Sequence, residues 1–342
     1  MEKGRQKATL KDIAKATGYS VNTVSRSLRD KDDIAVETRE KIKAVAREMG
    51  HVGNTLASSL RLGYTNTIAV ILPDVSNPHF AVMMKEVEGR AREDGYTSFL
   101  LNTNEDEELE LAAIQSALNK SVDGIILCPT QKSGDNIRYL QSVGVPFVLI
   151  GRRFQDLDTD YVICNDELGG YQATRLLLEL GHRDILMLNG PDYISSARER
   201  LVGYRRAFAE AGVPVREEYI RQVPVTAKGC QELLGRLEAE GVGFTAAFAF
   251  SDLLAWSLWN CLRQAGIRVP EDCSLVGFDH IQSRLTIPFP LTSVCSYKGC
   301  MSVGAVELLI DRMRGGDGGA CRHVVIDTDI APGTTTAALK KT

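Results

Sequence analysis

The sequence lacks any run of about eighteen apolar residues, the length that a membrane-spanning helix needs. Its first residues, Met1 to Lys7, are polar and lead into a polar helical pattern without the apolar core of a signal peptide. These two absences argue against a membrane-spanning protein and against an exported one. We therefore expect a cytoplasmic protein that has no membrane partner.

Motifs for catalysis and metal binding are missing as well. The chain has no G-x-x-x-x-G-K-[ST] loop, no G-x-G-x-x-G after a strand, no G-x-S-x-G and no H-E-x-x-H. Its five histidines have no metal-ligand spacing. We predict no catalytic residue, no metal and no cofactor, and hence no enzyme.

The eight cysteines are scattered along the chain and form no C-x-x-C pair. Reduced and mostly buried thiols are the expected state in the cytoplasm, with a disulfide framework or a zinc site as the alternatives. The cysteines are Cys128, Cys164, Cys230, Cys261, Cys273, Cys295, Cys300 and Cys321.

Charge is distributed unevenly along the 342 residues, which are 44% hydrophobic and 25% charged. This globular composition excludes disorder, collagen and coiled coil, and the length suggests about two domains plus a remainder. The first 65 residues hold 13 Lys and Arg against 8 Asp and Glu, and the rest hold 27 against 36. The net charge of −4 therefore divides into a basic head of +5 and an acidic body of −9.

The basic head has the pattern of a helix-turn-helix. Apolar residues recur at helical spacing on both sides of Gly18, a residue that permits a tight turn, and Ser20 can cap the second helix. Any antiparallel helix pair with a glycine turn would look similar. Ala35 is a poor cap, so the start of a third helix is less well defined. That helix has an apolar stripe of Ile42, Val45, Ala46 and Met49 and is expected to end at Gly50.

The order D-I-A-x-x-x-G-x-S-x-x-T-V-S-R, followed by T-R-E-K-I from Thr38, resembles the start of the LacI/GalR family of bacterial transcriptional repressors. The resemblance implies that Val21 and Asn22 read bases, together with Arg26. Chemistry supports this, because Arg26 can pair with guanine, Asn22 with adenine and Val21 with a thymine methyl group. Plain solvent exposure is the alternative for Asn22. The polar residues implied to meet phosphates are Thr9, Ser20, Thr23 and Ser25.

Residues 51–65 are predicted to form a hinge helix or linker. The resemblance implies a segment that becomes helical only when two copies meet on DNA, with Leu60 wedged into the minor groove. Asn54, a possible helix cap, and Ala57, on the same face as Leu60, are the other DNA-binding candidates of this segment. Gly53 replaces a frequent proline and Ser58 a frequent arginine, so we expect a weakly ordered hinge. A passive linker is the alternative.

Beyond Thr65, short β-rich runs alternate with helical segments, which predicts parallel sheets covered by helices. Together with V-D-G-I-I from Val122 and L-G-H-R from Leu180, this arrangement resembles the periplasmic-binding-protein fold of the same family. The predicted fold class is α/β: a small all-α helix-turn-helix headpiece (1–50) and a body (66–342) of two parallel-sheet subdomains. These subdomains comprise about 66–164 with 296–326, and about 165–295 with 327–342. The predicted strands are 68–72, 98–101, 124–127, 146–150, 161–164, 185–188, 245–250 and 274–278.

A ligand cleft is expected between the subdomains, at the carboxyl ends of the strands. Pro224 lies near a place where members of the resembled family often carry a stacking aromatic, and Ile194 argues against a purine. His79 and His280 are expected beside the cleft as hydrogen-bonding groups. For each charged candidate a structural pairing is the alternative. The candidates are Phe80, Arg152, Ser196, Arg200, Ser251, Asp252 and Asp279.

Taken together, these features predict a sequence-specific DNA-binding transcriptional regulator, a repressor, whose affinity for operator DNA is controlled by a small effector. A sugar, sugar phosphate or sugar acid is the effector that the resemblance favours. The body is expected to dimerise, giving a homodimer on near-palindromic double-stranded DNA. A solute-binding protein of the same fold is the alternative, and it would need export and no basic head.

Overall fold

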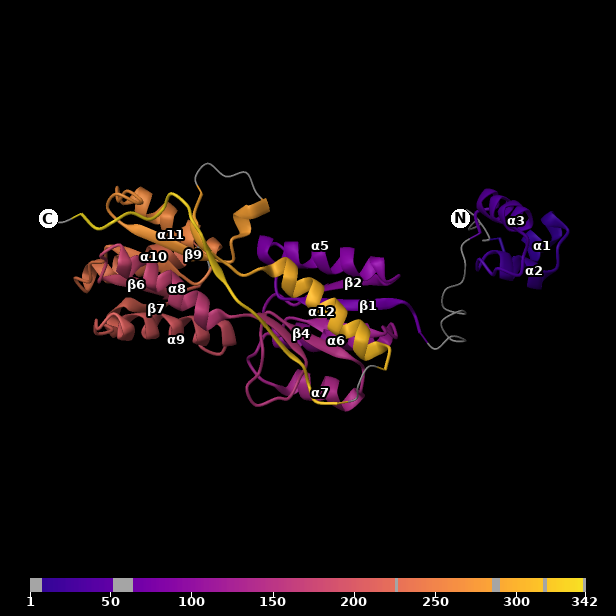
Figure 1. The fold of residues 1–342 in the computed structure, drawn as a ribbon, viewed down its shortest axis with the longest axis horizontal. Coiled ribbons are helices and arrows are strands. Elements are labelled where there is room, and N and C mark those ends of the chain that lie inside the picture. The colour runs from indigo at the N-terminus through magenta and orange to yellow at the C-terminus, as the bar shows by residue number, and fades with distance from the viewer. Residues whose placement is uncertain (1–7, 52–63, 225–226, 285–289, 316–318, 341–342) are drawn as a thin grey trace, which may run out of the picture. The chain divides into compact units, whose positions relative to one another are not determined.

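The computed structural model describes residues 8–51, 64–224, 227–284, 290–315 and 319–340. The chain separates into two compact units, residues 1–65 and residues 66–342, which we call the headpiece and the body (Figure 1).

The described part of the headpiece consists of three helices, as the pattern predicted. Thr9 begins the first in a reciprocal capping box with Asp12, and Gly18 ends it with a φ of 76° that favours glycine. Ser20 caps the second, because its Oγ accepts a hydrogen bond of 3.1 Å from the Thr23 amide. The helices are α1 (Leu10–Thr17), α2 (Val21–Ser27) and α3 (Val36–Glu48).

A small apolar core holds these helices together. Ile13, Val24 and Ile42, one from each helix, are completely buried. The third helix starts directly after Ala35, which makes no side-chain cap, in agreement with its poor capping chemistry. Met49 was predicted to face this core, but it follows the last helical residue and is 37% exposed.

The body contains two six-stranded sheets within its described residues. The first has the order β11-β5-β4-β3-β1-β2 and is parallel throughout. Its inner strands are apolar on both faces because helices cover both sides; all residues of β1 after Thr67 are buried. Its strands are β1 (Thr67–Leu72), β2 (Thr97–Asn102), β3 (Gly124–Leu127), β4 (Phe147–Ile150), β5 (Tyr161–Cys164) and β11 (His323–Ile326).

The second sheet has the order β12-β10-β9-β8-β6-β7. It is parallel except at its edge, where β12 runs antiparallel to β10. Its strands are β6 (Ile185–Asn189), β7 (Ile220–Gln222), β8 (Ala246–Ala249), β9 (Ser274–Phe278), β10 (Thr292–Cys295) and β12 (Asp329–Ala331).

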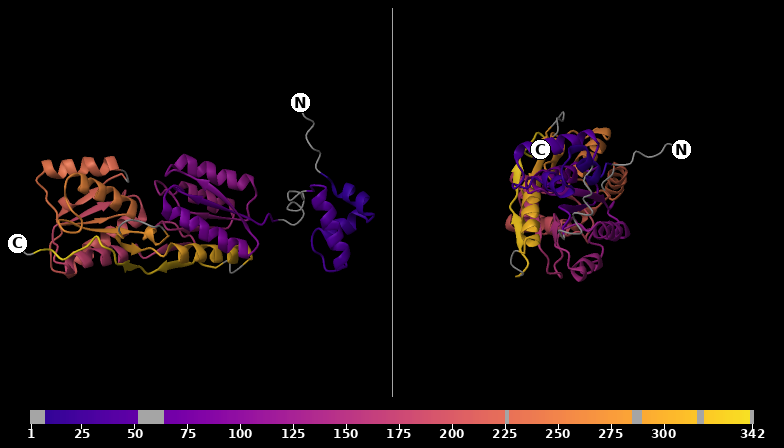
Figure 2. Two further views of the ribbon diagram at one scale, coloured as in Figure 1. Left: turned by 90° about the horizontal axis from the view of Figure 1, so that it is seen from above. Right: turned by 90° about the vertical axis from the view of Figure 1, so that its right-hand side faces the viewer.

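Each sheet with its helices forms a lobe, and the two lobes lie side by side in Figure 2. The chain passes between the sheets after β5, after β10 and between β11 and β12, where the yellow C-terminal segment runs from one lobe to the other. Helices α5 (Pro78–Glu93), α6 (Glu107–Asn119), α7 (Asp135–Val143) and α12 (Lys298–Met313) belong to the first lobe. Helices α8 (Asp166–Glu179), α9 (Ser195–Glu210), α10 (Ala227–Ala239) and α11 (Asp252–Gln264) belong to the second.

Helices α8 and α9 approach each other closely because glycines face each other at their contact. A Cβ on Gly203 of α9 would come within 2.1 Å of the Glu167 carbonyl oxygen, and one on Gly170 of α8 within 2.2 Å of the Arg200 carbonyl oxygen. The glycines therefore determine where α9 carries the Arg200 side chain.

We expect Gly203→Ala to destabilise the protein by about 3 kcal/mol, because backbone atoms cannot yield to the added methyl group. Gly235→Ala is the matched control: this helical glycine has open space around it, and alanine should stabilise α10 by up to about 1 kcal/mol. Urea unfolding of both variants tests this expectation. Equal midpoints for the two variants would contradict the tight contact.

All eight cysteines are free, as predicted, and five of them are buried. Cys295 and Cys321 are half-buried, and Cys300 is exposed. Across the described segments, no helix is both long enough and apolar enough to span a membrane.

Candidate functional site

A cavity of about 650 Å³ opens between the two lobes of the body. Its walls come from both lobes and include loops that follow the carboxyl ends of strands, where open α/β sheets present ligands. The lining residues are Asp74, Asn77, His79, Phe80, Glu105, Cys128, Gly151, Arg152, Pro191, Tyr193, Ile194, Ser196, Arg200, Gln222, Val223, Pro224, Phe250, Ser251, Leu253 and Asp279.

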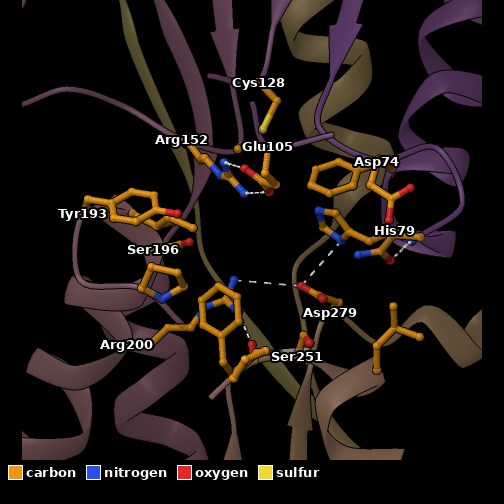
Figure 3. Close-up of a pocket in the computed structure, with 18 of the residues that line it drawn as sticks. Asp74, His79, Glu105, Cys128, Arg152, Tyr193, Ser196, Arg200, Ser251 and Asp279 are labelled. Atoms are coloured by element: carbon orange, nitrogen blue, oxygen red, sulfur yellow. Dashed lines mark hydrogen bonds and ion pairs between the residues drawn. The ribbon is translucent and has the colours of Figure 1, made fainter. Parts of the chain in front are cut away.

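Arg200 and His79 converge on the carboxylate of Asp279 (Figure 3). Arg200 Nη2 lies 3.9 Å from Asp279 Oδ1, and His79 Nδ1 lies 3.5 Å from the same oxygen. Because His79 belongs to α5 of the first lobe and Asp279 follows β9 of the second, this contact spans the cleft. A ligand in the cavity would meet a donor fork and an acceptor side by side, an arrangement that suits hydroxyl groups.

Arg200 is held in place on three sides. Its Nε donates to Asp166 Oδ1 at 2.8 Å, and its Nη1 donates to the Phe250 carbonyl oxygen. The guanidinium carbon lies 3.4 Å from the centroid of the Phe278 ring. These contacts orient the one remaining edge of Arg200 toward the cavity.

Burial controls the protonation of the acid and the histidine. It raises the pKa of Asp279 to about 6, although Arg200 and Lys298 oppose the rise. It lowers the pKa of His79 well below the usual histidine value, and Lys298, Arg200 and Arg152 lower it further. His79 is therefore neutral near pH 7, where Asp279 carries the negative charge.

Arg152 is paired inside the cavity wall. Its Nη1 and Nη2 donate to the two carboxylate oxygens of Glu105 at 2.8 and 2.6 Å, and Nη1 also donates to the Pro129 carbonyl oxygen at 2.8 Å. Sequence reasoning missed Glu105, since it begins an acidic run, Glu105 to Glu108, that reads as a solvated helix end. Asp106 does cap α6, but Glu105 precedes that cap with a φ of 57° and turns to Arg152.

Six of the seven predicted cleft residues line the cavity, and Asp252 does not. Asp252 is fully buried, where it accepts hydrogen bonds from the Ile281 amide at 2.8 Å and from Ser293 Oγ at 2.6 Å. Burial, with a contribution from Asp279, raises the pKa of Asp252 to about 7. The structure therefore corrects this candidate: Asp252 supports the loop after Asp279 and does not face the ligand space.

Aromatic rings line the cavity from both lobes. Phe80 was predicted, whereas Phe250 and Tyr193 were missed. Both missed residues follow strands of the second sheet, β8 and β6, so the rule about carboxyl ends would have found them. Ser251, predicted as a ligand contact, also caps α11 through its Oγ. His280 lines a smaller cavity of about 230 Å³ that shares Asp279 with the main one.

Two further contacts hold the lobes together at the edge of the cavity. The Ser195 amide donates to Gln131 Oε1 at 2.9 Å, and Arg153 Nη2 donates to Glu199 Oε1 at 2.7 Å. Gln131 and Arg153 belong to loops of the first lobe, and their partners belong to α9 of the second. These bonds must break or shift when the cleft changes its opening.

The headpiece presents its predicted reading residues on α2. Val21 and Asn22 are exposed, and Thr23, Ser25 and Arg26 are partly exposed. Arg26 donates to Asp33, and Ser25 Oγ accepts from Arg29 at 2.7 Å. Thr9 and Ser20 are the caps of α1 and α2, so both lie at helix N-termini, where phosphate groups are favoured. The predicted hinge contacts Asn54, Ala57 and Leu60 lie outside the described residues.

Comparison with protein families gives one match for each unit of the chain. Residues 9–54 match the bacterial regulatory proteins of the lacI family, and residues 65–295 match the periplasmic binding proteins and sugar binding domain of the LacI family. The chain belongs to the LacI family. It is a transcriptional regulator with a DNA-binding headpiece and a sugar-binding-type body, not an enzyme and not a plain solute-binding protein.

Curated relatives of this LacI-family chain are regulators over nearly their whole length. The HTH-type transcriptional regulator DegA of Bacillus subtilis is 36% identical over 84% of this chain and 86% of its own. The ribose operon repressor of Haemophilus influenzae is 30% identical over 90% and 92%, respectively. The PurR repressor of Actinobacillus pleuropneumoniae serotype 3 is also 30% identical, over 90% and 91%.

Solved structures show the same fold. The complex of the transcriptional regulator CelR with cellobiose is 28% identical, covers 96% of this chain and all of its own, and has a TM-score of 0.73. A lac repressor dimer bound to operator and the anti-inducer ONPF has a TM-score of 0.86 at 22% identity, covering 97% of this chain and all of its own.

Proposed function

We propose that this repressor binds a near-palindromic operator as a homodimer, in the cytoplasm where that DNA lies, and that its cavity binds a neutral carbohydrate. The observation that carries the ligand class is the charge balance of the cavity wall. The two cationic side chains among the described lining residues, Arg152 and Arg200, are each paired with a carboxylate, Glu105 and Asp166.

The remaining charges of the wall are negative. Asp279 and Asp74 line the same space, and Asp279 shares Arg200 with Asp166, which lies closer to the guanidinium group. An anionic ligand would therefore meet repulsion and find both guanidinium groups already engaged. A neutral ligand with several hydroxyl groups avoids this cost, and its ring can lie on Phe80 or Phe250. The charges of the cavity wall therefore favour a neutral sugar over a sugar phosphate or a sugar acid.

The proposed DNA contacts follow from the chemistry of α2. Arg26, Asn22 and Val21 would read base edges in the major groove, and Thr9, Ser20, Thr23 and Ser25 would meet phosphates. A reading helix of seven residues makes few contacts, so useful specificity requires two headpieces. Two-fold symmetry of the protein then implies two inverted half-sites.

Effector control would act through the cleft. A sugar that bridges Asp279 and the first lobe would change the opening between the lobes and the bonds at Gln131 and Arg153. By linkage, a ligand that alters DNA affinity by a given factor must have its own affinity altered by the same factor. A coupling of about 1–3 kcal/mol is enough for a regulator.

One experiment with the full chain tests this function. DNA selected from a random library by the full chain should carry two inverted half-sites. Calorimetry then measures the binding of each sugar to the protein, and the binding of the selected DNA to the protein with and without that sugar. Cellobiose, D-ribose and D-glucose are the neutral probes, and D-ribose 5-phosphate, D-glucose 6-phosphate and D-gluconate are the anionic ones. We expect at least one neutral probe to bind and to shift DNA affinity, while its anionic counterpart does not. Tighter binding of an anionic probe would overturn the ligand class.

A further inference from the structure

The loop between α2 and α3 is acidic, although it belongs to the basic headpiece. Residues 30–33 read D-K-D-D. Asp30 is paired with Lys43 of α3, whose Nζ lies 2.5 Å from Asp30 Oδ1. Asp33 instead contacts Arg26 of α2, the residue proposed to read guanine. The loop turns back along α2, since the Lys31 amide donates to the Arg26 carbonyl oxygen at 3.2 Å.

The contact between Arg26 and Asp33 uses one particular edge of the guanidinium group. Arg26 Nε donates to Asp33 Oδ1 at 3.3 Å, and Nη2 donates to Asp33 Oδ2. A guanidinium group has five N–H donors, of which this contact takes the Nε hydrogen and one on Nη2. Both hydrogens on Nη1 and the second one on Nη2 remain. These form the end of the fork, which can give two parallel bonds to guanine O6 and N7.

We propose that Asp33 is a positioning residue for DNA recognition, holding the side edge of Arg26 so that the end of its guanidinium fork is presented to a guanine. This inference rests on the proposed role of Arg26. Asp33 itself touches no base. It removes conformational freedom from a long side chain before binding, so that less entropy is lost when the base contact forms.

A stabilising role alone does not account for this pair. The side chains of Arg26 and Asp33 are 42% and 52% exposed, and exposed ion pairs add little to stability. A carboxylate beside the reading helix also repels DNA phosphates, which lowers affinity for every sequence. The orientation of Arg26 favours binding only where a guanine faces it, so it offsets this repulsion for the operator and not for random DNA.

Asp33→Asn separates these two effects because they have opposite signs. We expect the variant to bind random DNA as tightly as the wild type or more tightly, since one negative charge is gone. We expect its discrimination for guanine over the other bases at the Arg26 position to fall about five- to ten-fold. The readout is selection from a random DNA library with the full chain, followed by competition binding of the selected site against single-base variants.

Asp32→Asn is the matched control, because Asp32 lies in the same loop and approaches Arg39 no closer than 3.9 Å. It should reproduce the gain on random DNA and keep full discrimination for guanine. Undiminished or increased discrimination in Asp33→Asn would overturn the proposal and identify Asp33 as a residue that masks Arg26. Arg26→Ala in the same selection identifies the guanine position; if no position changes, the proposed role of Arg26 fails separately. Circular dichroism confirms that each variant is folded.

Discussion

Replacing Arg26 with alanine is expected to abolish the preference for operator DNA while leaving weak binding to any sequence. Each bidentate contact with guanine discriminates by about 1–3 kcal/mol, and a homodimer makes the contact twice. The expected loss is therefore about 2–6 kcal/mol, or roughly 30-fold to more than 10⁴-fold in the ratio of specific to random binding. The proposed phosphate contacts at the caps of α1 and α2 would be untouched, so the residual binding should keep most of its salt dependence.

Competition binding between the selected operator and random DNA measures this ratio. Arg29→Ala is the matched control, because this substitution removes the same positive charge from a nearby position. Arg29 itself donates hydrogen bonds to the Oγ and the carbonyl oxygen of Ser25 and is not proposed to read a base. It should weaken binding to all sequences to a similar extent. If Arg26→Ala retains wild-type specificity, α2 does not read the operator in the proposed way.

Removing the carboxylate of Asp279 is expected to abolish the effector response while operator binding persists. Hydrogen bonds to a charged group contribute about 1.5–3 kcal/mol each, so the loss of two sugar hydroxyl contacts weakens binding at least about a hundred-fold. The headpiece is a separate unit, so the DNA-binding surface should be unaffected. Calorimetry of Asp279→Ala with the neutral sugar that binds the wild type gives the affinity, and a gel-shift titration gives the response.

Asp192→Ala is the control for this experiment, since Asp192 is an exposed acid beside Tyr193 that does not line the cavity. It should bind the sugar like the wild type. Asp279→Asn distinguishes charge from shape, because the amide keeps one acceptor oxygen without the negative charge. Normal sugar affinity in Asp279→Ala would remove Asp279 from the binding site.

The sugar affinity of the wild type should depend on pH through the ionisation of Asp279. Burial raises the pKa of Asp279 to about 6, so the carboxylate is ionised above that pH in the empty cavity. Hydroxyl donors from the sugar favour the ionised form and lower its pKa in the complex. Sugar affinity should thus be complete above pH 6 and fall as the pH drops below it, a trend that Asp279→Asn lacks.

Local features of the sequence were enough to predict much of this structure. The eight predicted strands are present, because each is an apolar run between turn residues, and all of them except the half-exposed edge strand β2 are largely buried. Strands β7 and β12, with three residues each, were missed, since so short a run carries no periodic signal, and the four-residue strand β10 was missed as well. Strand β11 lies at the edge of its sheet, and its exposed valines, Val324 and Val325, do not read as a buried run.

The site shows where such reasoning stops. Phe80, Arg200 and Asp279 were predicted from motifs and strand ends, and they meet in the cavity as expected. Glu105 stands in an acidic run that is typical of a solvated helix end, so the sequence does not indicate its place in the cavity wall. Asp252 was predicted as a ligand contact because it follows a strand. Both assignments depended on a partner far away in the sequence, Arg152 for one and Ser293 for the other.

The sequence by itself thus determines the family, the helix-turn-helix and the alternation of strands and helices. It also determines which side chains stand at each strand end, since all of these follow from spacing and residue type within short segments. Which charges remain free is determined by contacts between distant segments. Pairing of Arg152 with Glu105 and of Arg200 with Asp166 makes the cavity wall suit a neutral ligand. The contact between Arg26 and Asp33 also depends on tertiary structure, because the loop between α2 and α3 must fold back onto α2 before the carboxylate can orient the guanidinium group.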